Sequence, residues 1–303
     1  MEKFETFTSV FGSSHESHYD GRTVDNITRH RRLLEGVLFF DRLLEAIGIQ
    51  NAAEHYPPHS DSSLKQLFKA ILEANVTDTH KAALLYYLRR DVRLEPEKFA
   101  TETYLPQRYI ILIDGLWHLD RLHLKEALVQ LTEPTLIPTF SEEILYTIGK
   151  NAPQHPELVL EYYNTTSPVL TTTRTLNVYF SALVNSSVTE AFFFTRRQSD
   201  TTRKHLFELL LALVHGSSSG GARAKRGTEL VGLPLETEEE EWLEEYLLKG
   251  KGKNLFGARD TVIVRRIATG RGNEIGSLAK ETKERKIDGM NWPQLVREME
   301  AGL

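Results

Sequence analysis

The chain has 303 residues, of which 40% are hydrophobic and 26% charged, and its formal net charge is -5. This hydrophobic content suffices for one large or two modest folded domains and excludes a mostly disordered chain. The lack of cysteine excludes disulfides, thiolate metal sites and cysteine nucleophiles, and the mildly acidic balance argues against a dedicated DNA-binding protein.

The sequence predicts neither a secretory signal nor a membrane span. The longest apolar run, residues 206–214, is interrupted by Glu208. The opening residues MEKFETFTS lack a basic segment followed by an apolar one. We therefore expect a soluble protein of the cytosol or nucleus.

Residues 1–22 are expected to form a flexible N-terminus. Within them Phe4, Phe7 and Phe11 recur at helical spacing. Two interpretations stay open: a loose terminus, or a short helix whose phenylalanines dock on the rest of the chain or on a partner.

Thr23 or Asp25 is expected to begin a helix that continues to Gly48. The basic cluster of residues 29–32 would lie in its first turns, where cations are slightly unfavourable. The cluster either forms a solvated face or faces a partner.

Further helices are expected to begin at Asp61, at Thr77 or Asp78, at Pro96 and at Pro106. The last of these helices is apolar nearly all round, with Tyr109, Ile110, Ile111, Leu112, Ile113, Leu116, Trp117 and Leu119. A soluble chain buries such a helix by surrounding it with others, so we expect a central packing element.

Five short amphipathic helices follow, and a longer one is expected from Asp200 to Gly216. Short helices joined by short turns favour neighbours stacked in chain order. The predicted fold class is all-α: an irregular α-helical solenoid over residues 23–215, with a flexible linker and a docked helical C-terminal tail.

The linker is placed at residues 216–236, because GSSSGGARAKRG has a flexible composition. Its cations Arg223, Lys225 and Arg226 form a weak nuclear import signal or a solvated linker end. Residues 237–303 are expected to form a helical tail that docks on the chain itself or on a partner.

Three stretches carry a resemblance to a known family. They are LIDGLWHLDRLHLKEALVQLTEPTLIPTFSEEIL, SSVTEAFFFTRR and EEEEWLEEYLLKGKGKNLFGARDTVIVRRIATGR. Together they resemble the helical domain of the ELYS-like nuclear-pore assembly proteins, in particular the short fungal members, and the likeness extends from about Thr23 to Gly270. The shared residues are packing residues, so the resemblance identifies a scaffold and no active site.

The resemblance implies a structural nucleoporin that attaches to the Y-shaped outer-ring complex of the nuclear pore. The implied partners are the long-arm nucleoporin built from a propeller and a solenoid, and a small β-propeller nucleoporin beside it. The implied location is the nucleus, at the pore and nuclear envelope. The sequence has no repeated Arg-Gly-Arg-Pro hook, only Gly270, Arg271 and Gly272, so direct DNA binding is not expected.

No catalytic or metal-binding motif is present, so we expect neither an enzyme nor a cofactor or metal. The glycine-rich stretches 250–257 and 270–276 follow predicted helices, as stop signals do, whereas a phosphate loop follows a strand. Two alternatives remain: a helical adaptor outside the pore, and a helical enzyme with dispersed site residues.

Partner-binding residues are sought where apolar side chains lack an obvious core. Phe193 is the middle of three consecutive phenylalanines, which cannot all share one narrow helical stripe. Either their helix is deeply buried, which is the favoured interpretation, or at least one phenylalanine is presented to a partner. The tail helices are too short to be stable alone, so their side chains must dock on the solenoid or on a partner. The tail candidates are Trp242, Tyr246, Leu247, Val262 and Ile263, with Arg259, Arg265 and Arg266 facing an acidic surface.

Overall fold

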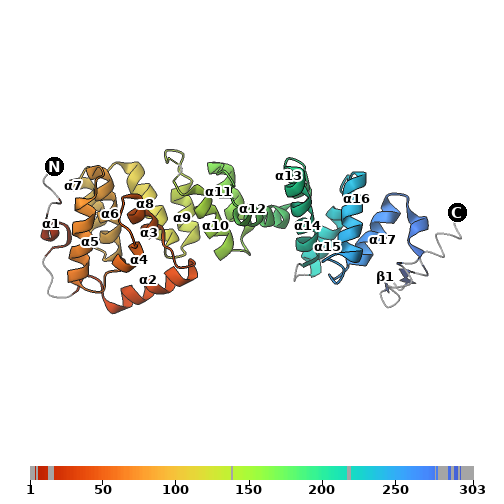
Figure 1. The fold of residues 1–303 in the computed structure, drawn as a ribbon, viewed down its shortest axis with the longest axis horizontal. Helices are drawn as coiled ribbons and strands as arrows, with labels where there is room; N and C mark the ends of the chain where they lie inside the picture. Colours follow the sequence, from red (N-terminus) through yellow and green to blue (C-terminus); the bar gives the residue numbers. More distant parts are fainter. Residues whose placement is uncertain are drawn as a thin grey trace. The chain divides into compact units, whose positions relative to one another are not determined.

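Helices form nearly all of the regular structure in the computed structural model of this chain (Figure 1). The structure describes residues 4, 6–12, 17–137, 139–216, 220–276, 278, 286–287, 290–292 and 294. Seventeen α-helices lie in these described residues, so the predicted all-α class is confirmed. The chain divides into two compact units, Met1–Thr175 and Leu176–Leu303, whereas the sequence places its main boundary after residue 215.

The first unit is built from short helices that pack mainly on near neighbours in the sequence, as expected for an irregular solenoid. The last helix of the series, α12, continues into the second unit. The helices are α1 Phe7–Phe11, α2 Gly21–Leu33, α3 Phe39–Ala46, α4 Ala52–His55, α5 Asp61–Glu73, α6 Asp78–Asp91, α7 Pro96–Glu102, α8 Gln107–Leu119, α9 Leu124–Leu131, α10 Ser141–Asn151, α11 Pro156–Thr166 and α12 Thr173–Ser186.

The N-terminal helix α1 docks on the first unit, which decides between the two interpretations of residues 1–22. The rings of Phe7 and Phe11 meet the ring of Phe68 edge to face, with centroids 5.8 and 6.2 Å apart. Val10 is fully buried. The described part of this segment is therefore a packed element of the fold, because its apolar side chains gain burial there.

The single helix predicted to run to Gly48 is wrong, because α2 and α3 are separate helices. Glu35 and Gly36 have φ angles of 59° and 91°, a left-handed conformation that ends a helix. The Gly36 N–H donates to the carbonyl of Arg31 at 2.8 Å. Most of the basic cluster 29–32 consequently lies in the last turn of α2, where cations are favourable.

A buried carboxylate, Asp91 at the end of α6, gathers donors from distant segments of the first unit. It accepts hydrogen bonds from the hydroxyls of Tyr19 (2.8 Å) and Tyr56 (2.6 Å) and from the indole N–H of Trp117 (2.9 Å), and it pairs with Arg121. The side chain of Asp91 is 0% exposed. A buried charge is tolerated when it is this well paired.

A second buried carboxylate, Asp120 at the end of α8, ties α8 to α3. It accepts hydrogen bonds from the backbone N–H groups of Phe39 (2.6 Å) and Phe40 (3.0 Å) and from the hydroxyl of Tyr87 (2.7 Å). The first N–H groups of a helix lack partners within the helix, so this carboxylate caps α3 from a distant part of the sequence.

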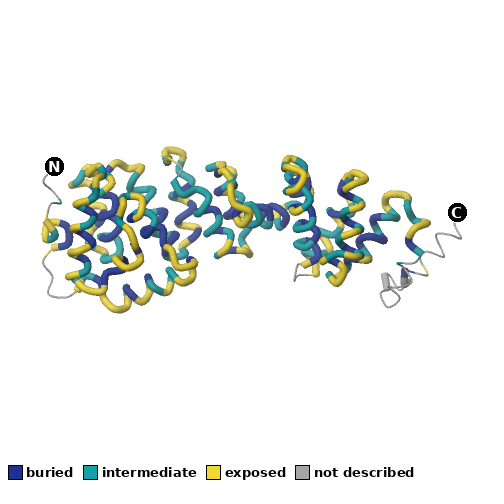
Figure 2. The backbone as a smooth tube through the Cα atoms, viewed as in Figure 1, coloured by how far each residue is buried: buried dark blue, intermediate teal, exposed yellow. Residues whose placement is uncertain are grey.

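The second unit continues with short helices in chain order (Figure 1). Within it, α14 contacts α13, α15 and α16, and α17 contacts α15. Figure 2 colours buried residues dark blue, and within each unit they alternate along the helices with exposed residues. The elements are α13 Val188–Thr195, α14 Asp200–Gly216, α15 Gly220–Val231, α16 Thr237–Glu244, the π-helix η1 Glu245–Lys249, α17 Ala258–Ala268, the 3-10 helix η2 Gly272–Glu274 and the short strands β1 Lys286–Ile287 and β2 Met290–Asn291.

The linker predicted at residues 216–236 is replaced over most of its length by the helix α15. Leu230 is fully buried, and the Glu229 carboxylate accepts a hydrogen bond from the Val188 N–H at 3.0 Å. These tertiary contacts outweigh the helix cost of the glycines, which is about 1 kcal/mol each.

The tail packs on the second unit as a set of helices, and its described end also contains two short strands. Lys286 pairs with Asn291 and Ile287 with Met290 in an antiparallel ladder, which the sequence does not predict. A terminal helix beginning at Pro293 is a further prediction, and residues 293 and 295–303 lie outside the described residues.

Candidate protein-interaction surfaces

Three of the tail residues predicted to bind a partner lie inside the second unit. Leu247, Val262 and Ile263 are 0% exposed. Their surface role is therefore wrong for this fold, and they belong to its core. Their helices are short, so burial against the rest of the unit is what stabilises them.

The predicted cations Arg265 and Arg266 bind carboxylates of the same unit. Arg265 contacts Glu240 at 2.7 Å, and its guanidinium also donates to the backbone carbonyl of Val231. Arg266 contacts Glu244 at 2.6 Å. The Arg266 guanidinium holds the pKa of the Glu244 carboxyl below its usual range. These arginines hold α17 against α16 and are not free to face an acidic partner.

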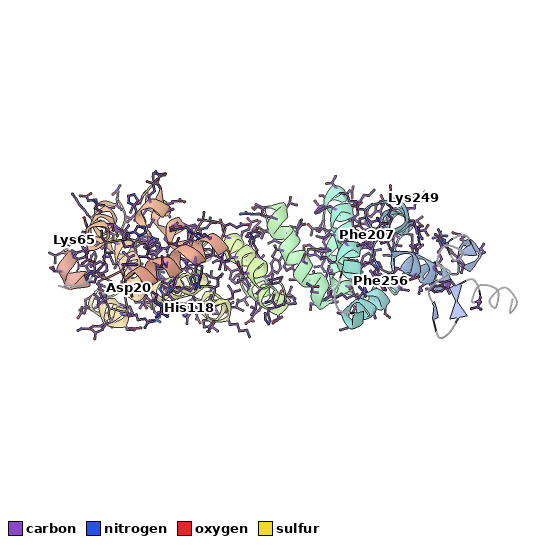
Figure 3. The ribbon with its side chains drawn as sticks, turned by 90° about the horizontal axis from the view of Figure 1, so that it is seen from below. Asp20, Lys65, His118, Phe207, Lys249 and Phe256 are labelled. Carbon is purple, nitrogen blue, oxygen red and sulfur yellow. The ribbon has the colours of Figure 1, made fainter. Side chains whose placement is uncertain are left out.

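The remaining tail candidates lie partly at the surface. Trp242 is half-buried, with its ring centroid 6.0 Å from that of Phe207 on α14. Figure 3 shows Phe207 among the side chains of the second unit and Lys249 at the edge of that unit. Tyr246 is half-buried and Arg259 is exposed. A partner-binding role for these three residues stays a prediction.

Phe193 is the predicted site residue whose apolar side chain is clearly presented to solvent. Ser187 caps α13, since its hydroxyl accepts the Glu190 N–H. On this helix Phe192 is fully buried, while Phe193 is 43% exposed. Of the two alternatives for the three phenylalanines, deep burial of the whole helix is therefore wrong, and presentation of Phe193 to a partner stays a prediction.

A pocket of about 390 Å³ accompanies Phe193 between α12 and α13. We call it the Phe193 pocket, and its lining residues are Tyr179, Leu183, Glu190, Phe193, Phe194 and Arg197. Its floor is aromatic, and Glu190 and Arg197 are both exposed. An aromatic floor with charged side chains beside it suits an apolar anchor of a partner protein.

The first unit carries an apolar groove of about 370 Å³, which we call the α8 groove. Its walls come from α3, α6, α8 and the segment that follows α9. It is lined by Leu43, Ala46, Ile47, Val76, His80, Ala83, Leu84, Arg108, Tyr109, Leu112, Ile113, Leu136, Ile137, Thr139 and Phe140. An adjoining pocket of about 290 Å³ shares Leu112, Leu136, Ile137 and Thr139 and adds Glu133.

The α8 groove explains why α8 is apolar nearly all round. Ile113, Leu116 and Leu119 are buried, as predicted for a central helix. Tyr109 and Leu112, however, are only half-buried and line the groove. A helix that is apolar nearly all round therefore indicates burial either by the protein itself or by a partner.

The described histidines do not gather into a metal site. His118 and His123 approach with ring nitrogens 3.5 Å apart, and burial together with the nearby Arg90 guanidinium lowers the pKa of His118 to about 4. Over the described residues, no group of three or more His, Cys, Asp or Glu side chains could hold a metal ion. In the same residues, no helix has the length and apolar character needed to cross a membrane.

Two comparisons with known proteins bear on these surfaces. A family model described as ELYS, nuclear pore complex assembly, matches residues 37–250. The chain is also similar to the uncharacterized protein ely5 of Schizosaccharomyces pombe, with 29% identity over 258 residues. That match covers 84% of this chain and 83% of the relative. The matched region includes the α8 groove, the Phe193 pocket and α16.

Proposed function

This chain belongs to the ELYS family of nuclear pore complex assembly proteins, and from that premise we propose that it is a structural nucleoporin of the Y-shaped outer-ring complex. Family membership implies a role in nuclear pore complex assembly and an association with the pore at the nuclear envelope. The observation that carries the proposal is the family match over residues 37–250.

The proposed partners are the long-arm nucleoporin built from a propeller and a solenoid, and the small β-propeller nucleoporin beside it. Their choice rests on the resemblance of the chain to the short fungal ELYS-like proteins. The structure supports a binding role because each unit presents apolar surface, at the α8 groove and at the Phe193 pocket. Contacts of this kind give affinity through a few buried anchors and not through total area.

The proposed mechanism is binding without catalysis. Both surfaces are lined mainly by apolar and aromatic side chains, and their charged residues lie at exposed positions. Such a lining suits the burial of side chains from another protein. The helices of the tail then serve to build the second unit, with Trp242 packed beside α14.

The test is size-exclusion chromatography of the purified full chain with a reconstituted Y-shaped nucleoporin scaffold. Point variants are preferable to removal of the tail, because α15 to α17 pack on α14 or on one another and their loss would expose the core. Phe193→Asp is the variant at the Phe193 pocket. Val169→Asp is the matched control, because Val169 is 78% exposed and lies outside both surfaces.

Co-elution of the unaltered chain and of Val169→Asp, with weaker co-elution of Phe193→Asp, is the expected result. Co-elution that Phe193→Asp leaves intact would keep the pore assignment and remove the Phe193 pocket from it. No co-elution of the unaltered chain at micromolar concentration, with both partners folded, would overturn the scaffold role. A fluorescently tagged chain absent from the nuclear rim would point to an adaptor outside the pore.

A further inference from the structure

The α8 groove combines an apolar lining with one charged side chain, Arg108. We propose that it receives an amphipathic helix of a partner protein, whose aliphatic side chains enter the groove and whose carboxylate pairs with Arg108. Only the expectation that this partner is a nucleoporin rests on the proposed function. The kind of segment is argued from the groove itself.

The groove is shaped to take side chains from outside. Ala46 on α3 and Ala83 on α6 are small and leave a depression between larger neighbours. A volume of about 370 Å³ holds two or three aliphatic side chains, since a cavity of ~150 Å³ holds one benzene-sized group. Ile137 is 69% exposed beside it. An occupant would therefore cover apolar surface that now faces water.

The walls of the groove favour a helix over an extended segment. An extended peptide gains its affinity from the unpaired backbone groups of a strand edge. Three walls of the groove are the helices α3, α6 and α8, whose backbone groups are used within those helices. In the fourth wall, the segment after α9, the Leu136 N–H donates to the Glu133 carbonyl and the Ile137 carbonyl accepts the Thr139 hydroxyl. A helix needs no backbone partner and offers apolar side chains at i, i+3 or i+4, and i+7.

The polar groups of the groove select the charge of the occupant. The His80 Nε2 lies 3.4 Å from the Tyr109 hydroxyl, and its Nδ1 lies 2.7 Å from the Thr77 hydroxyl, so both ring nitrogens have partners. Arg108 is exposed, with its guanidinium 5.3 Å from the Tyr109 ring centroid. Within the described residues Arg108 forms no ion pair. The charge left to complement is therefore positive, and an acidic side chain complements it.

The experiment measures binding of two designed helices of about 20 residues to the purified full chain by fluorescence anisotropy. Both helices carry the same leucine stripe. One has glutamates beside the stripe, and the other has lysines at the same positions. The variants of the chain are Arg108→Glu and Ile137→Asp. Val169→Asp is the control, because it places the same charge at an equally exposed position outside the groove.

The unaltered chain should bind the glutamate helix about three- to fivefold more tightly than the lysine helix, which is the upper part of the range for an exposed ion pair. Arg108→Glu should reverse this preference. Ile137→Asp should weaken both helices about tenfold, and Val169→Asp should change neither. All three substitutions lie at exposed positions, so far-UV circular dichroism should show an intact fold.

Several results would overturn the proposal. One is no binding of either helix, and another is equal weakening by Ile137→Asp and Val169→Asp, which would indicate non-specific adhesion. A third is a preference that Arg108→Glu leaves unchanged. Self-association of the chain that Ile137→Asp abolishes would assign the groove to a second copy instead. These peptide measurements do not involve the Y-shaped scaffold. The groove proposal can therefore fail while the proposed function is correct, and it can be correct while the proposed function fails.

Discussion

Arg265 and Arg266 show that the role of a charged side chain depends on whether it already has a partner. Both lie on α17 and were candidates for an acidic surface of another protein. Their carboxylates are supplied within the unit by Glu240 and Glu244. Both arginines therefore stabilise the fold of their own unit, because a buried charge is costly unless it is paired.

We expect Arg265→Ala to lower the free energy of unfolding by about 3 kcal/mol, because it leaves Glu240 without its cation in a site where both side chains are largely buried. Urea unfolding followed by circular dichroism measures this change. Lys251→Ala on an exposed turn is the control and should change stability by less than about 0.5 kcal/mol. If Arg265→Ala leaves the stability unchanged, Arg265 is not needed for the fold and again becomes a candidate for binding a partner.

Asp120 links stability to pH. Burial raises the pKa of its carboxyl to about 7 from an ordinary value of 3.8, although the Phe39 and Phe40 N–H groups and the Tyr87 hydroxyl favour the ionised form. Between pH 3.8 and about 7 the folded state keeps a proton that the unfolded state has lost. Stability from this group is therefore full below pH 3.8 and is lost as the pH rises toward 7.

We expect Asp120→Asn to flatten the pH dependence of unfolding over this interval. The slope removed corresponds to about 4 kcal/mol across it, because each pKa unit is worth about 1.4 kcal/mol. Urea unfolding at several pH values, for the unaltered chain and the variant, measures the difference, so that groups common to both cancel. The exposed Asp78→Asn should retain the original slope. The same slope in Asp120→Asn would show that Asp120 is not the titrating group.

At the scale of the element, α15 forms a helix although the amino-acid composition of its residues favours a flexible linker. Its glycines suggested a flexible linker, yet its Leu230 and Glu229 are fixed by the neighbouring helices. Gly227 lies within α15, and a Cβ added there would meet no atom within 4 Å. Glycine therefore weakens this helix without serving its packing.

We expect Gly227→Ala to raise the free energy of unfolding by about 0.5 to 1 kcal/mol, because alanine restricts the unfolded chain and suits a helix. Gly257→Ala is the comparison variant, for which the opposite effect is expected. Gly257 has a φ of 78° at the start of α17, and alanine is strained in that conformation. This substitution should lower stability by about 1 kcal/mol. Thermal or urea unfolding separates the two. Destabilisation by Gly227→Ala would contradict the helical assignment of residues 220–231.

Much of the element pattern could be predicted from local signals. Thr77 before α6, Pro96 at the start of α7 and Asp200 at the start of α14 are found where the sequence indicates. The break between α2 and α3 has one local signal, Gly36, which the prediction of a single helix to Gly48 overlooks. The start of α3 is capped by Asp120, which is 81 residues from Phe39 and invisible to a local pattern.

The site was less predictable than the fold, because exposure is a tertiary property. Val262 and Phe193 are both apolar residues on short helices, yet the first is buried and the second is 43% exposed. One signal for the tail was available in the sequence. The acidic run 238–241 and the basic pair Arg265 and Arg266 lie in the same tail, and opposite charges of this kind favour internal pairing.

At the scale of the whole molecule, the chain divides into two compact units. The large hydrophobic cluster that includes Phe40, Tyr56 and Tyr87 is contributed entirely by residues of the first unit. A unit with its own core has the main requirement for folding alone. The boundary at Thr175 and Leu176 falls inside α12, so one helix supplies residues to both units.

We expect the fragment of residues 1–175 to fold by itself and to unfold in one cooperative transition. Its buried Tyr56, Tyr86 and Tyr87 should give a near-UV circular dichroism signal that is lost together with the far-UV signal in urea. The full chain provides the reference spectrum. A fragment with helical far-UV signal but no near-UV signal, and with dye binding, would show that the first unit needs the second.

The α8 groove also bears on how much of this protein a cell can hold. A copy without a partner leaves Ile137 and the apolar lining open to water, and surfaces of this kind drive aggregation and attract quality control. We therefore expect the half-life of the chain to depend on the supply of its partner. Ile137→Asp should lengthen the life of the orphan copy, and cycloheximide-chase measurements of both forms would reveal whether it does. In this way the groove would match the abundance of the chain to that of the assembly it joins.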